Sequence, residues 1–356
     1  MAAVFYNAGV KTWDAIIVGG GIVGLSLARE LRKCSASVLV LERGQPGRES
    51  SSAAAGMLVE TGTEVPQPLK PLAAASARMY PEFVEELQDE SGLDVDYRRE
   101  GSILLGGDSF VSSSNTLSSN ELARLEPHLK VAAAATFFAD ASVDPRALVH
   151  AAHEACKHRG VQVSSGEEVT SIDLINGRVT GVITSKTRFP GASVINCAGA
   201  WAGQFPPCPF PTRPRKGQML AVAMPSRDFV RHVIRAPDVY LVPRSDGRLL
   251  VGATVEDVGY DKRVDPRTIH RLHRAAMNLV PGLTEARLLE DWAGLRPGTP
   301  DDLPILGATQ VPGYFVAAGH FRDGILLSPI TAQIMAQVVT GLKPAFDLSP
   351  FSADRF

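Results

Sequence analysis

A glycine-rich turn between a short apolar strand and an amphipathic helix is the feature that most constrains this chain. Residues 14–18 have the apolar composition of a buried strand, and residues 22–33 carry apolar side chains at helical spacing. Between them, Gly19, Gly21 and Gly24 fit the pattern G-x-G-x-x-G. The first glycine permits a tight turn, the second lets the backbone approach a phosphate, and the third lets the helix pack closely on the strand. The pattern therefore predicts the opening of a dinucleotide-binding α/β unit.

The second strand of this unit ends on an acid. Residues 37–41 form an apolar strand, and Glu42 follows Gly19 by 23 residues. A carboxylate at that point can accept hydrogen bonds from both ribose hydroxyls, and it would repel a 2′-phosphate. An ordinary glycine turn is the alternative, but the strand, the helix and the acid agree on a nucleotide site. FAD and NAD both remain open on these residues alone.

Composition and charge narrow the class of the protein. The 356 residues suffice for about two domains, and 45% hydrophobic with 21% charged residues is ordinary for a globular protein. A net charge of −2 gives no reason to expect a nucleic-acid partner, and no apolar run is long enough for stable membrane insertion. Residues 1–7 lack the pattern of a secretory signal, and the four cysteines include no CxxC pair. We therefore expect a cytoplasmic protein.

The order of the remaining elements indicates that the chain leaves the opening unit and later returns to it. Residues 47–56 are small and polar, and we expect a loop there. We predict a helix over 72–90, interrupted or restarted at Pro81, and a helix over 145–159. Further strands are expected at 95–105, 161–163, 169–174, 179–184, 192–196, 217–224, 239–244, 249–254, 286–292 and 314–318, and further helices at 266–279 and 327–340. Both domains are therefore expected to be discontinuous.

Two further patterns, a group of possible metal ligands and two short basic clusters, give weaker indications of function. His150, His153 and Cys156 recur every third residue on one predicted helix, but the spacing matches no standard ligand pattern, so we expect no metal site. The short basic clusters at residues 213–216 and 262–263 are expected on the solvated surface.

Several later segments decide between the cofactors. They lie at residues 50–57, 196–201, 240–244, 250–254, 292–299 and 319–327. In sequence and in order they closely resemble motifs of the D-amino acid oxidase superfamily of flavoproteins, and within it those of the glycine oxidases of thiamine biosynthesis. The resemblance runs from about Asp14 to Leu327, which is nearly the whole chain.

The resemblance implies an α/β fold with noncovalently bound FAD. It implies a Rossmann-type FAD-binding domain of the glutathione reductase kind and a second, α+β substrate domain built on a large antiparallel sheet. We expect residues 1–77, 143–205 and 290–356 in the FAD-binding domain, and residues 78–142 and 206–289 in the substrate domain. No cysteine lies in the flavin-facing C-terminal segment, which argues against a covalent thioether link. A homotetramer is also implied.

The resemblance also assigns the cofactor residues. In this interpretation Gly324 opens the last helix, so that the helix N-terminus faces the flavin and stabilises negative charge there; a plain strand–helix turn is the alternative. The residues expected to bind FAD are Gly19, Gly21, Ile22, Val23 and Gly24 at the pyrophosphate, Glu42 and Arg43 at the adenosine, Val169 at the adenine, Ser50, Ser51, Ala55, Gly56 and Met57 along the ribityl chain and flavin edge, Gly199, and His320, Phe321, Arg322, Asp323, Gly324, Ile325 and Leu326 around the pyrimidine side.

The substrate end needs a group that holds a carboxylate. Arg296 is the best candidate, because a guanidinium fork matches a carboxylate with two parallel hydrogen bonds; a structural ion pair is the alternative. By resemblance, Tyr240 adds a hydroxyl to the same carboxylate, unless it is a core-edge tyrosine, and Met57 narrows the pocket. Arg322 would reach the substrate or pack near the flavin. Asp323 stands where the family usually has asparagine, and an aspartate would pair with a neighbouring arginine, which puts the role of Arg322 in question.

The implied reaction is oxidative deamination of glycine and other small amines or D-amino acids to the imine. Reduced FAD would return its electrons to O₂ and give H₂O₂, and the imine would hydrolyse or supply thiamine thiazole synthesis. One alternative is a D-amino acid dehydrogenase that uses a quinone-type acceptor. The other is a noncatalytic FAD-binding protein, although such a protein would have no need of Arg296 and Tyr240.

Overall fold

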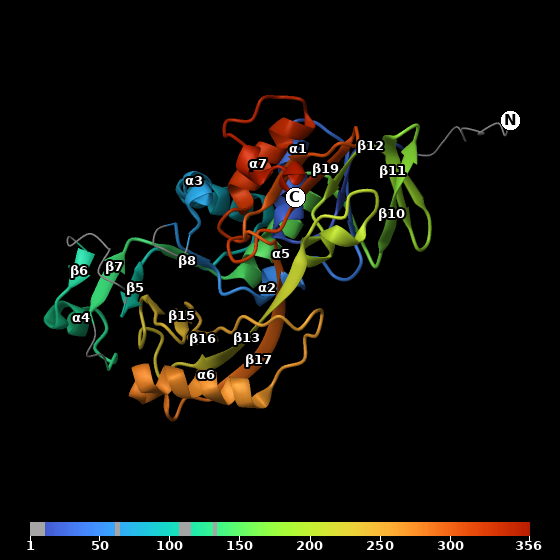
Figure 1. Ribbon diagram of the computed structural model, residues 1–356. Helices are drawn as coiled ribbons and strands as arrows, with labels where there is room; N and C mark the ends of the chain where they lie inside the picture. The colour runs from blue at the N-terminus through green and yellow to red at the C-terminus, as the bar shows by residue number, and fades with distance from the viewer. Residues whose placement is uncertain (1–10, 61–64, 107–114, 131–133) are drawn as a thin grey trace.

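Two large sheets organise the chain, which a computed structural model describes over residues 11–60, 65–106, 115–130 and 134–356. Each sheet has eight strands; the first occupies the upper part of Figure 1 and the second the lower and left parts. This architecture confirms the predicted α/β class. The expectation about residues 1–7 lies outside the described residues.

The first sheet has a parallel core. Strand β1 (Trp13–Val18) lies between β2 (Val38–Glu42) and β12 (Arg188–Asn196) and pairs in parallel with both. Outside them, β9 (Gln162–Ser165) pairs in parallel with β2, and β19 (Tyr314–Ala318) with β12. Parallel strands end at the same edge of a sheet, so the glycine turn after β1 is flanked by the ends of β2 and β12.

Four helices share one apolar core on this sheet. They are α1 (Ile22–Lys33), α3 (Lys70–Ser91), α5 (Pro145–His158) and α7 (Ser328–Val339), and their buried side chains form one cluster with β1 and β2. The prediction for α1 is confirmed at both ends. A second cluster covers the opposite face beneath the hairpin of β10 (Val169–Ile175) and β11 (Arg178–Thr184), which turns on Asn176–Gly177 as predicted.

The predicted helix ranges 72–90 and 327–340 agree with α3 and α7 to within two residues, but two interpretations of these helices are wrong. Helix α3 runs through Pro81 without a break, because buried side chains on both sides of it, Leu72 and Leu87 among them, hold the two halves in one line. Helix α7 begins at Ser328 and not at Gly324. A helix that began at Gly324 would place Pro329 in its interior, where the ring clashes with the preceding turn, whereas a start at Ser328 places the proline in the first turn.

The second sheet is almost entirely antiparallel. Its strands follow the order β17-β13-β16-β15-β14-β5-β7-β6, and the β14–β5 pair is parallel. Helix α6 (Pro266–Leu279) covers one face, as predicted. The strands are β5 (Ser102–Leu105), β6 (Thr116–Leu117), β7 (Ala135–Phe138), β13 (Arg213–Ala223), β14 (Val233–Arg235), β15 (Tyr240–Pro243), β16 (Arg248–Gly252) and β17 (Leu288–Gly298). Strand β17 extends six residues beyond its predicted end, as far as Gly298.

Buried charges join the two halves of the molecule. Asp144 caps α5 by accepting the backbone N–H of Arg146 at 2.8 Å, and it also pairs with Arg248 of β16 at 2.7 Å. The fully buried Arg244 donates to the carbonyl of Ala55 and lies 3.9 Å from Asp144. A small sheet of β3 (Met57–Leu58), β8 (Ala141–Val143) and β4 (Tyr97–Arg98) lies at the same junction.

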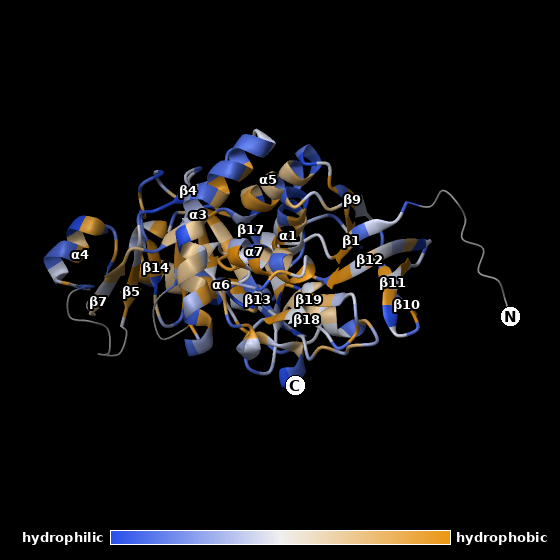
Figure 2. Ribbon diagram, turned by 90° about the horizontal axis from the view of Figure 1, so that it is seen from above, coloured by the Kyte–Doolittle hydropathy of each residue, from blue (hydrophilic) through white to orange (hydrophobic). Residues whose placement is uncertain are grey.

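The division into two domains remains a proposal. The first sheet draws its strands from residues 13–42, 162–196 and 305–318, and the second from 102–138 and 213–298, so both are discontinuous in sequence. The proposed boundary at residue 290 falls inside β17. Figure 2 shows mainly apolar strands in the first sheet and helices with hydrophilic stretches outside it.

Within the described ranges, no helix combines the length and apolar character that crossing a membrane requires.

Candidate active site

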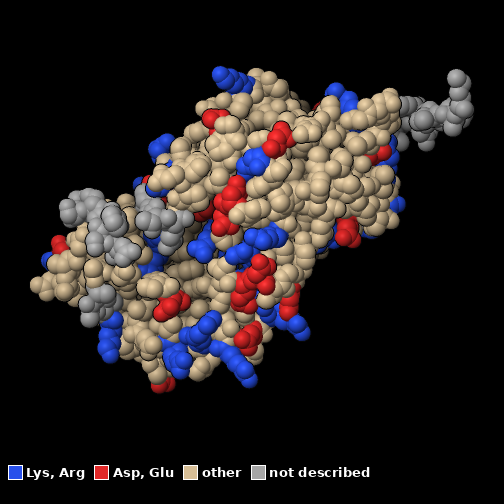
Figure 3. Space-filling view, in the orientation of Figure 1, with Lys and Arg blue, Asp and Glu red and all other residues tan. Residues whose placement is uncertain are grey.

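A long cavity of about 890 Å³ connects the glycine turn with the second sheet. One end lies at the carboxyl ends of β1, β2 and β12, and the other is walled by β13, β15 and β17. Figure 3 shows acidic and basic side chains interleaved across the middle of one face, with no broad area of one sign.

The glycine turn leaves room for backbone where side chains would collide. Gly19 has φ +110°, and a Cβ there would lie 2.5 Å from the carbonyl oxygen of Cys197. A Cβ at Gly24 would lie 2.1 Å from the carbonyl oxygen of Gly19, so only glycine lets α1 pack this closely on β1. A Cβ at Gly21 would meet one atom within 4 Å, the hydroxyl of Ser51 at 3.3 Å. Gly21 therefore faces the open cavity, whereas Gly24 lies behind its wall.

Glu42 is held in place by backbone donors. Its two carboxylate oxygens accept the N–H groups of Gly20 at 2.9 Å and Gly44 at 2.8 Å. Each oxygen keeps a second lone pair, so an oriented acceptor remains for ribose hydroxyls. At the same end of the cavity, a buried carboxylate oxygen of Glu167 has no hydrogen-bond partner within the described part of the chain. Val169, at the start of β10, borders the same space.

The predicted loop at residues 47–56 contains one helical turn, α2 (Ser50–Ala53). The hydroxyl of Ser51 accepts the N–H of Ile22 at 3.0 Å, and Ser50 donates to the carbonyl of Leu295 on β17. Because α2 makes these bonds, it ties the first turn of α1 to the second sheet. A Cβ at Gly56, at φ +72°, would lie 1.9 Å from a backbone carbonyl, so glycine is needed there before Met57 enters the cavity wall.

The segment before α7 forms the far wall of the cavity. His320 is buried, its Nε2 lies 3.2 Å from the hydroxyl of Thr331, and burial lowers its pKa to about 4. The N–H groups of Gly324 and Ile325 border the cavity and find no acceptor among the described residues. These free donors occupy the place where the sequence predicted a helix N-terminus. The side chain of Leu326 is buried behind the wall.

Arg296 and Tyr240 reach the cavity from strands β17 and β15 of the second sheet, which β13 and β16 separate. Arg296, on β17, donates from Nη1 to the carbonyl of Thr254 at 3.0 Å and pairs with no carboxylate within the described residues. Burial lowers the pKa of Arg296 and raises that of Tyr240 on β15, while their mutual interaction opposes both shifts. A partly buried cation with unused donors is suited to a carboxylate ligand.

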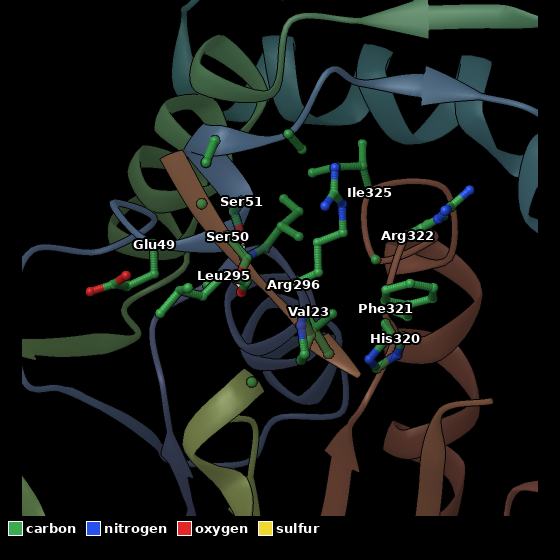
Figure 4. A pocket seen from close by; sticks show the side chains of 18 of the residues that line it. Val23, Glu49, Ser50, Ser51, Leu295, Arg296, His320, Phe321, Arg322 and Ile325 are labelled. Atoms are coloured by element: carbon green, nitrogen blue, oxygen red, sulfur yellow. Dashed lines mark hydrogen bonds between the residues drawn. The ribbon is translucent and has the colours of Figure 1, made fainter. Parts of the chain in front are cut away.

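Arg322 lies at the rim of the same cavity. Its side chain is exposed, its Cζ lies 5.3 Å from the ring centroid of Phe321, and Figure 4 shows it directed away from Arg296. Phe321 itself has a left-handed backbone with φ +46°. Asp323 also borders the cavity. The arrangement brings Arg296 and Tyr240 together, whereas a direct contact of Arg322 with substrate stays a prediction.

Two glycines that sequence reasoning missed provide space for these side chains. A Cβ at Gly217 of β13 would lie 2.3 to 2.6 Å from the guanidinium atoms of Arg296. A Cβ at Gly252 of β16 would lie 2.7 Å from the ring of Tyr240, which is its direct cross-strand partner. On β17, Gly294 faces Gly217, two residues before Arg296 and on the same side of the strand. These glycines can be recognised only from the strand register, which the spacing of residues in the sequence does not reveal.

The mouth of the cavity adds charged groups that the sequence did not indicate. Arg235 and Asp238, from the end of β14 and the segment after it, line this part of the wall. Arg235 lies 3.7 Å from Asp140, and both are buried. Asp238 is exposed.

The three residues of the weak metal pattern do not converge. Cys156 is buried and contacts the carbonyl of Leu25 at 3.2 Å, whereas His150 is exposed. Within the described ranges, no group of three metal-ligating side chains comes together.

A nucleotide cradle lies at the ends of the parallel strands, and its cavity continues to the partly buried cation Arg296 in the second sheet. This arrangement defines a nucleotide-dependent oxidoreductase with a separate substrate sheet. Residues 14–338 match the model of the DAO family, described as FAD dependent oxidoreductase. The chain belongs to this family, and its cofactor is FAD. The glycine cradle, the free N–H groups of Gly324 and Ile325 and the unpartnered oxygen of Glu167 all fit that group.

Individual relatives are similar over nearly the whole chain. The bifunctional protein ThiO/ThiG of Synechocystis sp. is 36% identical over 358 residues, which cover 97% of this chain and 54% of the relative. The chain thus spans about half the length of these two-part relatives. A glycine oxidase of Geobacillus kaustophilus is 33% identical over 368 residues, 96% of this chain and 97% of the relative. The crystal structure of glycine oxidase from Geobacillus kaustophilus matches with a TM-score of 0.91 at 33% identity, covering 97% and 99% of the two chains.

Proposed function

We propose that this protein oxidises glycine and other small amines or D-amino acids to their imines, with O₂ as the electron acceptor and H₂O₂ as a product. The observation that carries the proposal is Arg296, a partly buried guanidinium beside the Tyr240 hydroxyl that has no carboxylate partner among the described residues. The similarity to glycine oxidases supports the same substrate class.

The chain's own residues orient the substrate. Bound FAD supplies the two-electron acceptor. Arg296 holds the substrate carboxylate through two parallel hydrogen bonds, and the hydroxyl of Tyr240 donates a further bond to it. A fixed carboxylate leaves the α-carbon little freedom to move away from the flavin, and orientation of this kind accounts for much of catalysis. Met57 and Met219 line the same wall, and their apolar side chains exclude water from the α-carbon.

The amine must be neutral when it reacts, and the described residues of the cavity wall do not include a histidine suited to remove its proton. His320 borders the cavity, but its ring faces Thr331 and burial keeps it neutral above pH 4. We therefore propose that the substrate binds with its amine already neutral, or loses the proton to solvent. Activity should then rise with pH as the free amine becomes more abundant, without an inflection from His320.

The decisive experiment is anaerobic mixing of the purified holoenzyme with glycine, followed by admission of O₂. Flavin absorbance near ~450 nm should bleach under glycine and return with O₂, together with stoichiometric H₂O₂. Bleaching without oxygen consumption would instead support a dehydrogenase with a quinone-type acceptor. An unchanged spectrum with glycine, sarcosine and D-alanine would leave a noncatalytic flavoprotein.

Two further expectations belong to this proposal. The glycine-derived imine would supply thiamine thiazole synthesis, as the resemblance to the glycine oxidases of thiamine biosynthesis implies. The family resemblance favours a homotetramer, and light scattering of the purified holoenzyme measures its mass directly.

A further inference from the structure

Two side chains meet across the cofactor groove. Arg43 directly follows β2, and Trp201 lies just beyond β12, in the short turn of residues 199–204. Strands β2 and β12 flank β1 on opposite sides, so their backbones are separated by about two strand spacings, roughly 10 Å. The guanidinium carbon of Arg43 nevertheless lies 3.7 Å from the ring centroid of Trp201. The contact therefore spans the groove at the end of β1, where the glycine turn begins.

The contact continues into a loop of the second sheet. The ring of Tyr260 stacks on Trp201 with a centroid separation of 5.4 Å and an interplanar angle of 29°. Lys262, in the same loop, lies 3.0 and 3.1 Å from the carboxylate oxygens of Glu49. Glu49 in turn accepts from Arg43 at 3.2 Å. Arg43, Glu49, Trp201, Tyr260 and Lys262 thus form a closed ring of contacts, which we call the bridge.

The loop that carries Tyr260 and Lys262 is firmly anchored at its base. Lys216 of β13 donates from Nζ to the carbonyl of Arg263 at 2.5 Å, and its backbone pairs with that of Glu256. The N–H of Asp265 donates to the side chain of Gln218 at 2.7 Å. Lys216 is buried, so the expectation of a fully solvated basic cluster there is wrong.

The position of the bridge relates it to the cofactor. Arg43, Glu49 and Trp201 all border the cavity, on the stretch between the glycine turn and the space beside Glu42 and Val169. An extended dinucleotide that occupies this cavity has its pyrophosphate on the glycine turn and its adenosine beside Glu42. The bridge lies over that half of it. Tyr260 and Lys262 form the solvent side of the bridge, with 42% of Tyr260 and 46% of the Lys262 side chain exposed.

We propose that the bridge closes over the pyrophosphate and adenosine of bound FAD and limits the rate at which the noncovalent cofactor leaves. The inference rests on FAD binding and not on the choice of substrate. Its closure depends on a loop of the substrate sheet, so retention of FAD requires the two halves of the molecule to be docked. The ion pair of Glu49 with Lys262 is exposed, and added salt weakens such pairs.

The test is the rate of FAD release from purified holoenzyme, followed by the rise of flavin fluorescence after strong dilution into buffer, where rebinding is negligible. Tyr260→Ala should accelerate release by roughly two- to tenfold, the worth of one stacking contact, and Lys262→Met by up to about fivefold, the worth of one exposed ion pair. Release from the unaltered protein should also accelerate between low and high salt, and this salt dependence should be smaller in Lys262→Met.

The matched control is Arg263→Ala. Arg263 adjoins Lys262 in the loop, its side chain is 90% exposed, and it pairs only with Asp261 among the described residues. Its replacement should leave release within about twofold of the unaltered protein. Equal release rates for Tyr260→Ala, Lys262→Met and the unaltered chain, at unchanged thermal stability, would overturn the proposal. Because the readout is cofactor release, this result is independent of whether glycine is oxidised.

Discussion

Arg296 depends on a residue that has no side chain. Its guanidinium occupies the space in which a Cβ at Gly217 would collide with it. The order of motifs identified Arg296, because a fork-shaped cation near a flavin segment is chemically distinctive. Gly217 carries no such signature, and its importance follows only from the pairing of β13 with β17. Chemically distinctive residues could therefore be predicted from the sequence, and the residues that make room for them could not.

Arg296→Met should abolish the carboxylate clamp while leaving the cofactor bound. Loss of a charge-assisted bidentate pair in a buried site should lower kcat/KM for glycine by about 10²- to 10³-fold. Steady-state oxygen uptake measures this loss, and the flavin absorbance of the purified variant reports cofactor content. Arg296→Lys should recover only part of the activity, since an ammonium lacks the planar fork. Unchanged turnover in Arg296→Met would contradict the assignment.

Gly217→Ala should displace the same guanidinium without removing it. The added methyl group would lie 2.3 to 2.6 Å from its atoms, so Arg296 must move by about 1 Å. We expect a rise in KM of about tenfold or more, with a smaller change in kcat and full FAD content. Gly282→Ala is the control, because its Cβ would crowd Phe229 at 2.4 Å outside the cavity wall. If both variants change KM equally, general crowding and not the clamp explains the result.

At the scale of elements, the interiors of helices were predicted from the sequence more accurately than the segments that lead into them. Helix α1 begins and ends as predicted because a glycine turn precedes it and its apolar spacing is regular. The range 327–340 predicted for α7 is right to within one residue, but the interpretation that Gly324 opens this helix is wrong, because the pattern of glycine and apolar residues at 319–327 does not distinguish a helix from consecutive turns. The result matters for the site, since turns leave the N–H groups of Gly324 and Ile325 facing the cavity.

The contact between α1 and α3 contains a buried ion pair that should give the fold an acid limit. Arg29 donates to Glu90 at 2.5 and 2.6 Å and to Glu86 at 2.7 Å. Despite burial, which acts in the opposite direction, hydrogen bonds with Arg29 and Arg159 lower the pKa of Glu90 from 4.5 to about 2. The folded pKa lies below the unfolded one, so the pair stabilises fully above about pH 4.5 and is lost as the pH falls toward 2.

Glu90→Gln should therefore lower the free energy of unfolding by roughly 2 to 4 kcal/mol at neutral pH. The difference between this variant and the unaltered protein should shrink as the pH falls from 4.5 toward 2. Urea unfolding at a series of pH values, followed by circular dichroism, measures both effects. A difference that does not vary with pH would show that the carboxylate's charge is not what stabilises the contact.

At the scale of the whole molecule, the two halves are joined by Asp144, which both caps α5 and pairs with Arg248. Asp144→Ala should remove the cap and leave the buried Arg244 without its nearest carboxylate, at a cost of about 3 to 5 kcal/mol. Asp144→Asn should cost less, because an amide oxygen still caps the helix. Differential scanning calorimetry measures both variants, and equal losses would indicate that the charge of Asp144 alone matters and that the cap contributes nothing.

The overall course of the chain was predictable because motif order reflects it. The return from the second sheet to the first was inferred from the strand and glycines around residues 314–324, and β19 confirms it by pairing with β12. Contacts between loops that are distant in the sequence could not be predicted. Nothing in the sequence places Tyr260 beside Trp201, since 59 residues and several strands separate them. Such contacts arise only when both sheets are assembled.

The continuous course of β17 has a consequence for attempts to give this scaffold new substrates. One uninterrupted strand carries Trp292, Gly294 and Arg296 on the same side, opposite β13. Inserting or deleting a single residue would turn Arg296 to the far side of the sheet and abolish the clamp entirely. Changes in specificity must therefore come through substitution along this strand, whereas length variation is tolerable in the segment of Pro237 and Asp238 at the mouth. Variant libraries that change the length of the Pro237–Asp238 segment and the side chains along β17 would explore the accessible range of amine substrates.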